Sequence, residues 1–176
     1  MWIKLYHDEQ DSSDCAIMGT VHKPFYASGF LYHLKTQQIL LQQSNIGDSS
    51  LTSWSMFGGV SHEGEDELSA FQRIMQEQVN LHLVTKHLFP VYDYFHNTLN
   101  KIHFVMYAEV QKLHAFPLLN ADSFSWFTFK QTTKLDFSPQ TKQDIIISER
   151  VIKAQARSLE PAVLISPLKQ YAGLYH

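Results

Sequence analysis

Cysteine and long apolar runs are what this chain of 176 residues has least of. It holds one cysteine, Cys15, which excludes an internal disulfide and indicates a reducing compartment. No stretch approaches the roughly 20 apolar residues of a membrane span, and the first residues, MWIKLYHDEQ, lack the apolar core of a signal peptide. We therefore expect a cytoplasmic protein that has no membrane partner.

A basic excess is also missing, because the formal net charge is -3 with histidine neutral. A broad surface for nucleic acid would need such an excess, so we expect no nucleic-acid partner. The ten histidines are scattered, and none forms the HExxH spacing of a zinc site. The chain is 44% hydrophobic and 18% charged, which is enough to bury a core. Its length predicts a single domain over residues 1–176.

Local patterns predict an alternation of strands and helices. Aromatic and alternating segments predict strands at 1–7, 25–35, 39–43, 82–95 and 101–111, with hairpins joining the second to the third and the fourth to the fifth. Residues 44–53 predict a loop, and the aromatic-rich 116–129 is expected to be irregular. Residues 138–157 predict a helix, since Ser138 is a favourable N-cap and Pro139 suits the first helical position. The tail to residue 176 is broken by prolines.

The run WSMFGGVSHEGEDELSAFQRIMQEQVNL, residues 54–81, combines a glycine pair with an acidic helix. Gly58 and Gly59 let the backbone approach a ligand with its carbonyls or amides exposed. Asp66 is the expected cap of a helix that runs to about Val79, and Asn80 tolerates the left-handed backbone of a helix end. The run therefore predicts a ligand loop leading into a helix.

The helix has two faces of different character. An apolar stripe is expected from Leu68, Phe71, Met75 and Val79. Positions 74, 77 and 78 are predicted to share another face, where three acids would suit Mg²⁺ or Mn²⁺. This chain has Ile74, Glu77 and Gln78 there, so only one of the three is an acid.

The segment from Gly59 to Leu81 resembles the Nudix box, G-x5-E-x7-R-E-U-x-E-E-x-G-U, in which U is a bulky aliphatic residue. The matching residues are Gly59, Glu65, Arg73, Met75, Glu77 and Leu81, and the departures are Ile74, Gln78 and Asn80. The resemblance, with its flanking strands, extends over roughly residues 25–157. It implies an α/β fold: a Nudix-like α/β/α sandwich with a mixed β-sheet flanked by helices.

The resemblance implies a hydrolase that cleaves a diphosphate linkage in a nucleoside diphosphate-X substrate with Mg²⁺ or Mn²⁺. It assigns catalysis to Glu77, Arg73 and Glu65, a ligand loop to Gly58 and Gly59, and metal binding to Glu77, Glu65 and the Gly59 carbonyl. Two other readings stay open. One is a protein that binds a nucleotide or related metabolite without cleaving it, and the other is an interaction module that keeps only the fold. The particular substrate and the formation of a homodimer are also left open.

Two further residue sets have alternative readings. The acids that could replace the missing box carboxylates are Glu63, Glu109, Asp122 and Asp136, although a solvated surface acid is the commoner role for each. A set of aromatic residues has two possible roles, stacking on a base or packing in the core or in a dimer contact, and packing is the commoner role. Its members are Phe116, Phe124, Trp126, Phe127 and Phe129.

Overall fold

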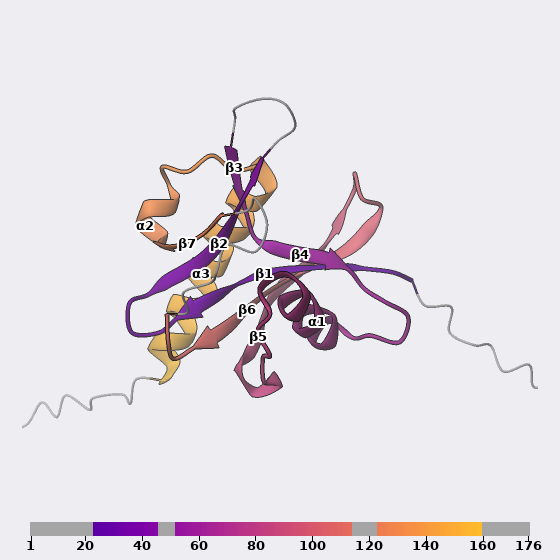
Figure 1. Ribbon diagram of the computed structural model, residues 1–176, viewed down its shortest axis with the longest axis horizontal. Coiled ribbons are helices and arrows are strands. Elements are labelled where there is room, and N and C mark those ends of the chain that lie inside the picture. Colours follow the sequence, from indigo (N-terminus) through magenta and orange to yellow (C-terminus); the bar gives the residue numbers. More distant parts are fainter. Residues whose placement is uncertain (1–22, 46–51, 114–122, 160–176) are drawn as a thin grey trace, which may run out of the picture.

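The computed structural model describes residues 23–45, 52–113 and 123–159 (Figure 1). The strand expected at 1–7, Cys15, Phe116, Asp122 and the tail beyond 159 lie outside these residues. Single-domain organisation over 1–176 therefore stays a prediction. In the part of the chain that the structure describes, no helix is long and apolar enough to cross a membrane.

A mixed sheet of seven strands forms the centre of the fold. The strands are β1 (Tyr26–His33), β2 (Gln38–Asn45), β3 (Thr52–Ser55), β4 (Phe57–Val60), β5 (Leu88–His96), β6 (Lys101–Val110) and β7 (Ser123–Thr128). The main path runs β3-β2-β1-β6-β5, while β4 pairs with β1 and β7 with β2. The pair β1–β6 is parallel and the others are antiparallel. The prediction of a mixed sheet is confirmed.

Helices cover both faces of this sheet, as can be followed in Figure 1. They are α1 (Glu67–Val79), the 3-10 turn η1 (Thr85–His87), the short α2 (Phe129–Thr132) and α3 (Pro139–Leu159). Because side chains alternate along a strand, Ala27 and Leu31 pack with α1, whereas Phe30 and Tyr32 pack with α3. The α/β/α sandwich is confirmed, with one hydrophobic core on each face.

The predictions from local sequence patterns are confirmed where the pairing is local. The hairpins β1–β2 and β5–β6 form, although β5 begins only at Leu88 because residues 85–87 take the 3-10 turn. The helix at 138–157 is α3, and the Ser138 Oγ accepts from the Thr141 backbone N–H at 3.1 Å, as expected of an N-cap.

Two predictions of irregular structure are wrong. Residues 52–55 form β3 and residues 123–128 form β7, and both strands pair with β2. Their sequences are rich in serine and threonine or carry no clean alternation. These segments are strands because they pair with β2, and the local sequence pattern does not indicate that pairing.

The aromatic side chains near β7 belong to the two cores. Phe124 and Trp126 pack against the core on the α1 face, and Phe127 and Phe129 lie in the core on the α3 face. The packing role is confirmed for these four residues.

Candidate functional site

The candidate site begins with two glycines on β4, which the antiparallel register with β1 fixes in place. Gly58 lies opposite Ser28, and Gly59 lies opposite Ala27. A Cβ on Gly59 would lie 3.2 Å from a side-chain carbon of Ile74 on α1. A Cβ on Gly58 would point the other way, 2.7 Å from the Tyr26 hydroxyl. The glycine strand is therefore a thin partition between α1 and the opposite side of the sheet.

Helix α1 is fixed at both ends by the residues expected from the sequence. The Asp66 Oδ1 accepts from the Ser69 backbone N–H at 2.7 Å, and the Asp66 N–H donates to the Ser69 Oγ at 3.0 Å. This reciprocal pair satisfies donors that the first helical turn leaves open. Asn80 ends the helix with a left-handed φ of 52°, as predicted.

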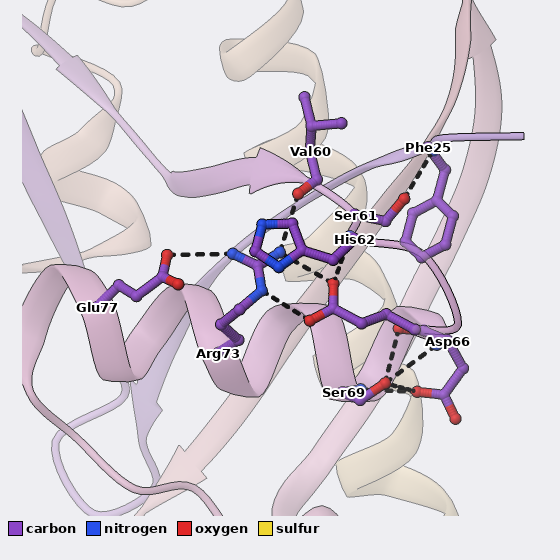
Figure 2. A network of polar contacts seen from close by, with 9 residues as sticks. Phe25, Val60, Ser61, His62, Asp66, Ser69, Arg73 and Glu77 are labelled. Carbon is purple, nitrogen blue, oxygen red and sulfur yellow. Dashed lines mark hydrogen bonds and ion pairs between the residues drawn. The ribbon is translucent and has the colours of Figure 1, made fainter. Parts of the chain in front are cut away.

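Arg73 gathers the box carboxylates around itself (Figure 2). Its Nε and Nη2 donate to the two carboxylate oxygens of Glu65 at 2.7 and 3.0 Å, and its Nη1 donates to Glu77 at 3.1 Å. Nη2 also donates to the Val60 carbonyl at 2.9 Å. The predicted residues Glu65, Arg73 and Glu77 are thus brought together, and the guanidinium bonds both acids.

Glu65 is the most strongly perturbed acid of this group. Its pKa is lowered from 4.5 to about 2, chiefly by the side-chain hydrogen bonds from Arg73. Burial opposes this shift, and the His62 backbone N–H, which donates at 2.7 Å, adds to it. Glu65 therefore stays charged, with its oxygens occupied, across the physiological range.

Gln78 and Ile74 close the space between α1 and the glycine strand. The Gln78 Nε2 donates to the Gly58 carbonyl at 2.9 Å. Ile74 is 1% exposed and belongs to the core on the α1 face. The expectation that positions 74, 77 and 78 share one ligand-facing side is therefore wrong for Ile74, which extends the apolar stripe because it packs on the Cα of Gly59.

The residues present do not fit a protein-bound Mg²⁺ or Mn²⁺. Among residues 23–45, 52–113 and 123–159, no group of three or more His, Cys, Asp or Glu side chains could hold a metal ion. Glu65 and Glu77 are both bound by Arg73, and Gln78 turns an amide donor toward the loop where a cation would need oxygen ligands. Glu77, Glu65 and Gly59, to which metal binding was assigned, thus do not form a cluster of carboxylates free to bind a cation.

Two of the other candidate acids lie away from the glycine loop, and Asp122 lies outside the described residues. Gly59 pairs with Ala27, which pairs with Phe104, so Glu109 lies about 16 Å farther along β6. Asp136 lies beside β3, where its carbonyl accepts from the Trp54 backbone, and Glu63 is exposed. The catalytic roles of the box residues stay predictions.

A cavity of about 370 Å³ opens on the other side of the glycine strand, between the sheet and the first turns of α3. Its walls include Tyr26, Ser28, His96, His103, Gln140 and Asp144. Sequence reasoning missed these residues, because they come from four elements and form no local motif. The only signal was the density of aromatic and histidine residues along β5 and β6.

Comparison with known proteins decides the family. A family model described as the NUDIX domain matches residues 24–146. The chain belongs to the Nudix family. The box identified from Gly59 to Leu81 lies inside the matched segment, and within this family Ile74 and Gln78 replace two acids of the box.

Solved structures show the same Nudix fold at low sequence identity. A mutT/nudix family protein from Listeria innocua has a TM-score of 0.60 and 17% identity, covering 76% of this chain and 96% of that one. The NUDIX domain of Shewanella oneidensis NrtR complexed with ADP ribose has a TM-score of 0.57 and 14% identity, covering 73% of this chain and 87% of that one. An Ap4A hydrolase binary complex from C. elegans has a TM-score of 0.56 and 16% identity, covering 73% of this chain and 98% of that one. A search of curated proteins finds no significant sequence match.

Proposed function

We propose that this Nudix protein binds a nucleoside diphosphate derivative beside the Gly58–Gly59 loop and does not carry out divalent-metal hydrolysis at its box. The hydrogen bond from the Gln78 amide to the Gly58 carbonyl carries the proposal. Gln78 thus offers a neutral N–H donor to the Gly58 carbonyl, where a glutamate would offer a carboxylate to a cation.

The charges around the loop support the same conclusion. Arg73 pairs with both Glu65 and Glu77 within the protein, and Ile74 contributes no polar atom. A dication placed here would bind a carboxylate that already pairs with Arg73 and would repel the guanidinium. The box therefore supports the packing of α1 against β4 rather than a metal-diphosphate complex.

The cavity supports the choice of ligand. Its 370 Å³ falls in the usual size range of small-molecule sites, and none of its described lining residues is Lys or Arg. It therefore suits the uncharged nucleoside portion of a ligand. The diphosphate would lie toward the glycine backbone and the first turn of α3, whose N-terminal end favours negative charge. Similar folds occur in a domain complexed with ADP ribose and in an Ap4A hydrolase complex.

The second candidate is a divergent Nudix hydrolase that uses Mg²⁺ or Mn²⁺. One observation favours it: the Glu77 side chain is 55% exposed and holds Arg73 by a single hydrogen bond, so this carboxylate can be released most easily. One assay of ligand binding and metal-dependent turnover distinguishes the two candidate functions.

The test measures binding and turnover together. The purified protein is titrated by calorimetry with ADP-ribose, NADH, a nucleoside triphosphate and a dinucleotide polyphosphate, and phosphate-containing products are followed with Mg²⁺, with Mn²⁺ and with EDTA. We expect saturable binding to at least one ligand and no product that depends on metal. Gly58→Val, which places carbon atoms against Tyr26 and Ser28, should abolish binding.

Two outcomes contradict the proposal. Metal-dependent product formation that Glu77→Gln removes establishes the hydrolase instead. Absence of binding to every ligand of the panel, by a protein that unfolds cooperatively, leaves a fold used for interaction only. Glu63→Gln is the matched control for Glu77→Gln, since Glu63 is an exposed acid outside the Arg73 network.

A further inference from the structure

The turn at residues 97–100, which joins β5 to β6, contributes to the edge of the cavity. His96, the last residue of β5, and Leu99 in the turn both line the cavity, and Leu99 is 43% exposed. The Leu99 backbone N–H donates to the His96 Nδ1 at 3.2 Å, and the Asn100 backbone N–H donates to the Asn97 carbonyl at 3.2 Å. The first of these bonds depends on an imidazole, the side chain whose charge changes most readily near neutral pH.

The hydrogen bond from Leu99 fixes the protonation state of His96. A backbone N–H can only donate, so Nδ1 accepts with its lone pair and carries no proton. A neutral imidazole has one N–H, which is therefore at Nε2. A protonated imidazole donates from both nitrogens, and its Nδ1–H would face the Leu99 N–H. The hydrogen bond and the protonated form of His96 thus exclude each other.

The titratable groups around His96 come from the strands and from α3. The ring centroids of Tyr94 on β5 and of His103 on β6 each lie 6.1 Å from that of His96, and Lys101 is its partner in the β5–β6 register. The titratable side chains that line the cavity with it are Tyr26, His103 and Asp144. No ion pair joins His96 to an acid within residues 23–45, 52–113 and 123–159. In this part of the chain, protonation of His96 therefore removes a hydrogen bond without an ion pair already in place.

We propose that protonation of His96 releases the turn at 97–100 and loosens the edge of the cavity, so that the affinity for a ligand falls as the pH drops below neutral. The inference rests on the proposed function, because it describes how pH regulates the ligand site in this cavity. It gives His96 a role beyond lining the site, since its neutral form is what holds the turn.

Loss of the hydrogen bond acts on the cavity through two of its lining residues. While the bond is present, the Leu99 backbone and the His96 ring hold each other in place at the edge of the cavity. When Nδ1 is protonated, the two N–H groups repel each other and Leu99 moves away from the ring. A ligand then has to order both residues as it binds, and this ordering lowers its affinity.

Two other effects of low pH can be separated from release of the turn. His103 also lines the cavity, but burial lowers its pKa, which Asp144 opposes and His96 reinforces, so His103 is neutral near pH 7. A substitution at His96 leaves His103 in place, so an effect carried by His103 persists in that variant. The positive charge of a protonated His96 also attracts a diphosphate, and high salt screens this attraction.

The test follows the ligand-free full chain by NMR between about pH 8 and about pH 5, and then measures the affinity for ADP-ribose by calorimetry in high salt. We expect the Leu99 amide proton and the His96 ring to titrate with one midpoint. The affinity should fall about three- to tenfold on acidification, the value of one net hydrogen bond. His96→Asn offers an oxygen that accepts the Leu99 N–H and takes up no proton, so its amide resonance and its affinity should not depend on pH.

Two further variants complete the test. His96→Phe keeps a ring but offers no acceptor, so its affinity at neutral pH should already match that of the wild type at low pH. His82→Asn is the matched control, because His82 is exposed and does not line the cavity, and it should keep the wild-type pH dependence. A Leu99 amide that does not follow His96, or the wild-type pH dependence in His96→Asn, overturns the proposal. If ADP-ribose binds at no pH, the ligand site fails, whereas the NMR titration still decides whether the turn is released.

Discussion

At the scale of the residue, two substitutions change what the Nudix box does in this chain. Gln78 offers an N–H to a backbone carbonyl, and Ile74 packs in the core. Both side chains are neutral, so Arg73 is left with two carboxylates and no competing cation. The resulting cluster is an internal ion pair of the protein, whose strength can be measured through protonation.

The pH dependence of stability provides that measurement. The folded-state pKa of Glu65 is lowered from 4.5 to about 2, so its contribution to the free energy of unfolding is fully present above pH 4.5. As the pH falls from 4.5 toward 2, the unfolded chain binds a proton that the folded chain does not, and the contribution is lost. We expect a loss of about 1–3 kcal/mol after allowance for solvent screening.

Urea unfolding at a series of pH values checks this expectation. Glu65→Gln should flatten the curve in that window, whereas Glu63→Gln, a change at an exposed acid of the same loop, should leave it unchanged. An identical slope in the wild type and Glu65→Gln would contradict the assigned ion pair.

At the scale of the element, helix α1 depends on its cap. Asp66 and Ser69 satisfy each other's backbone N–H groups, and Asp66 also lies at the positive end of the helix. Asp66→Ala should cost about 1 kcal/mol, and Asp66→Asn should retain most of the stability because its side chain still accepts a hydrogen bond. Chemical denaturation of the three proteins tests this, and equal stability of Asp66→Ala and wild type would contradict it.

The elements also show what sequence can predict. Asp66, Asn80, Ser138 and Pro139 are helix-end signals that act over a few residues, so the bounds of α1 and the start of α3 were predictable. Strands β3 and β7 were not, because their order comes from pairing with β2, which is distant from β7 in the sequence. The position of Ile74 was missed for the same reason, since its burial depends on β4 approaching α1 at a glycine.

At the scale of the whole molecule, the sheet separates two regions, and the glycine strand borders both of them. The Arg73 network and the core around Ile74 lie on the α1 side, and the cavity lies on the α3 side. The hydrogen-bonded residues Ser28, His103, Tyr94 and Asp144 could not be predicted to lie together. Ser28 and His103 are 75 residues apart in the sequence, and the parallel pairing of β1 with β6 makes them neighbours.

This arrangement gives an expectation for restoring the box glutamate. Ile74→Glu puts a carboxylate into the core on the α1 face and should cost about 3 kcal/mol or more. Ile74→Val, the matched control, should cost about 1 kcal/mol. Thermal unfolding of both variants measures these two losses of stability. A stable Ile74→Glu protein would show that this position faces solvent instead.

The most direct test of the central claim is a calorimetric titration of the wild-type protein with Mn²⁺ at neutral pH. A site in which Gln78 offers an amide N–H to the Gly58 carbonyl, and in which Arg73 bonds both acids, should show no saturable binding below about 1 mM. Gln78→Glu, which replaces the amide donor by a carboxylate beside the Gly58 carbonyl, should create a measurable site. Saturable one-to-one binding by the wild type at micromolar Mn²⁺, lost in Glu77→Gln, would contradict the account.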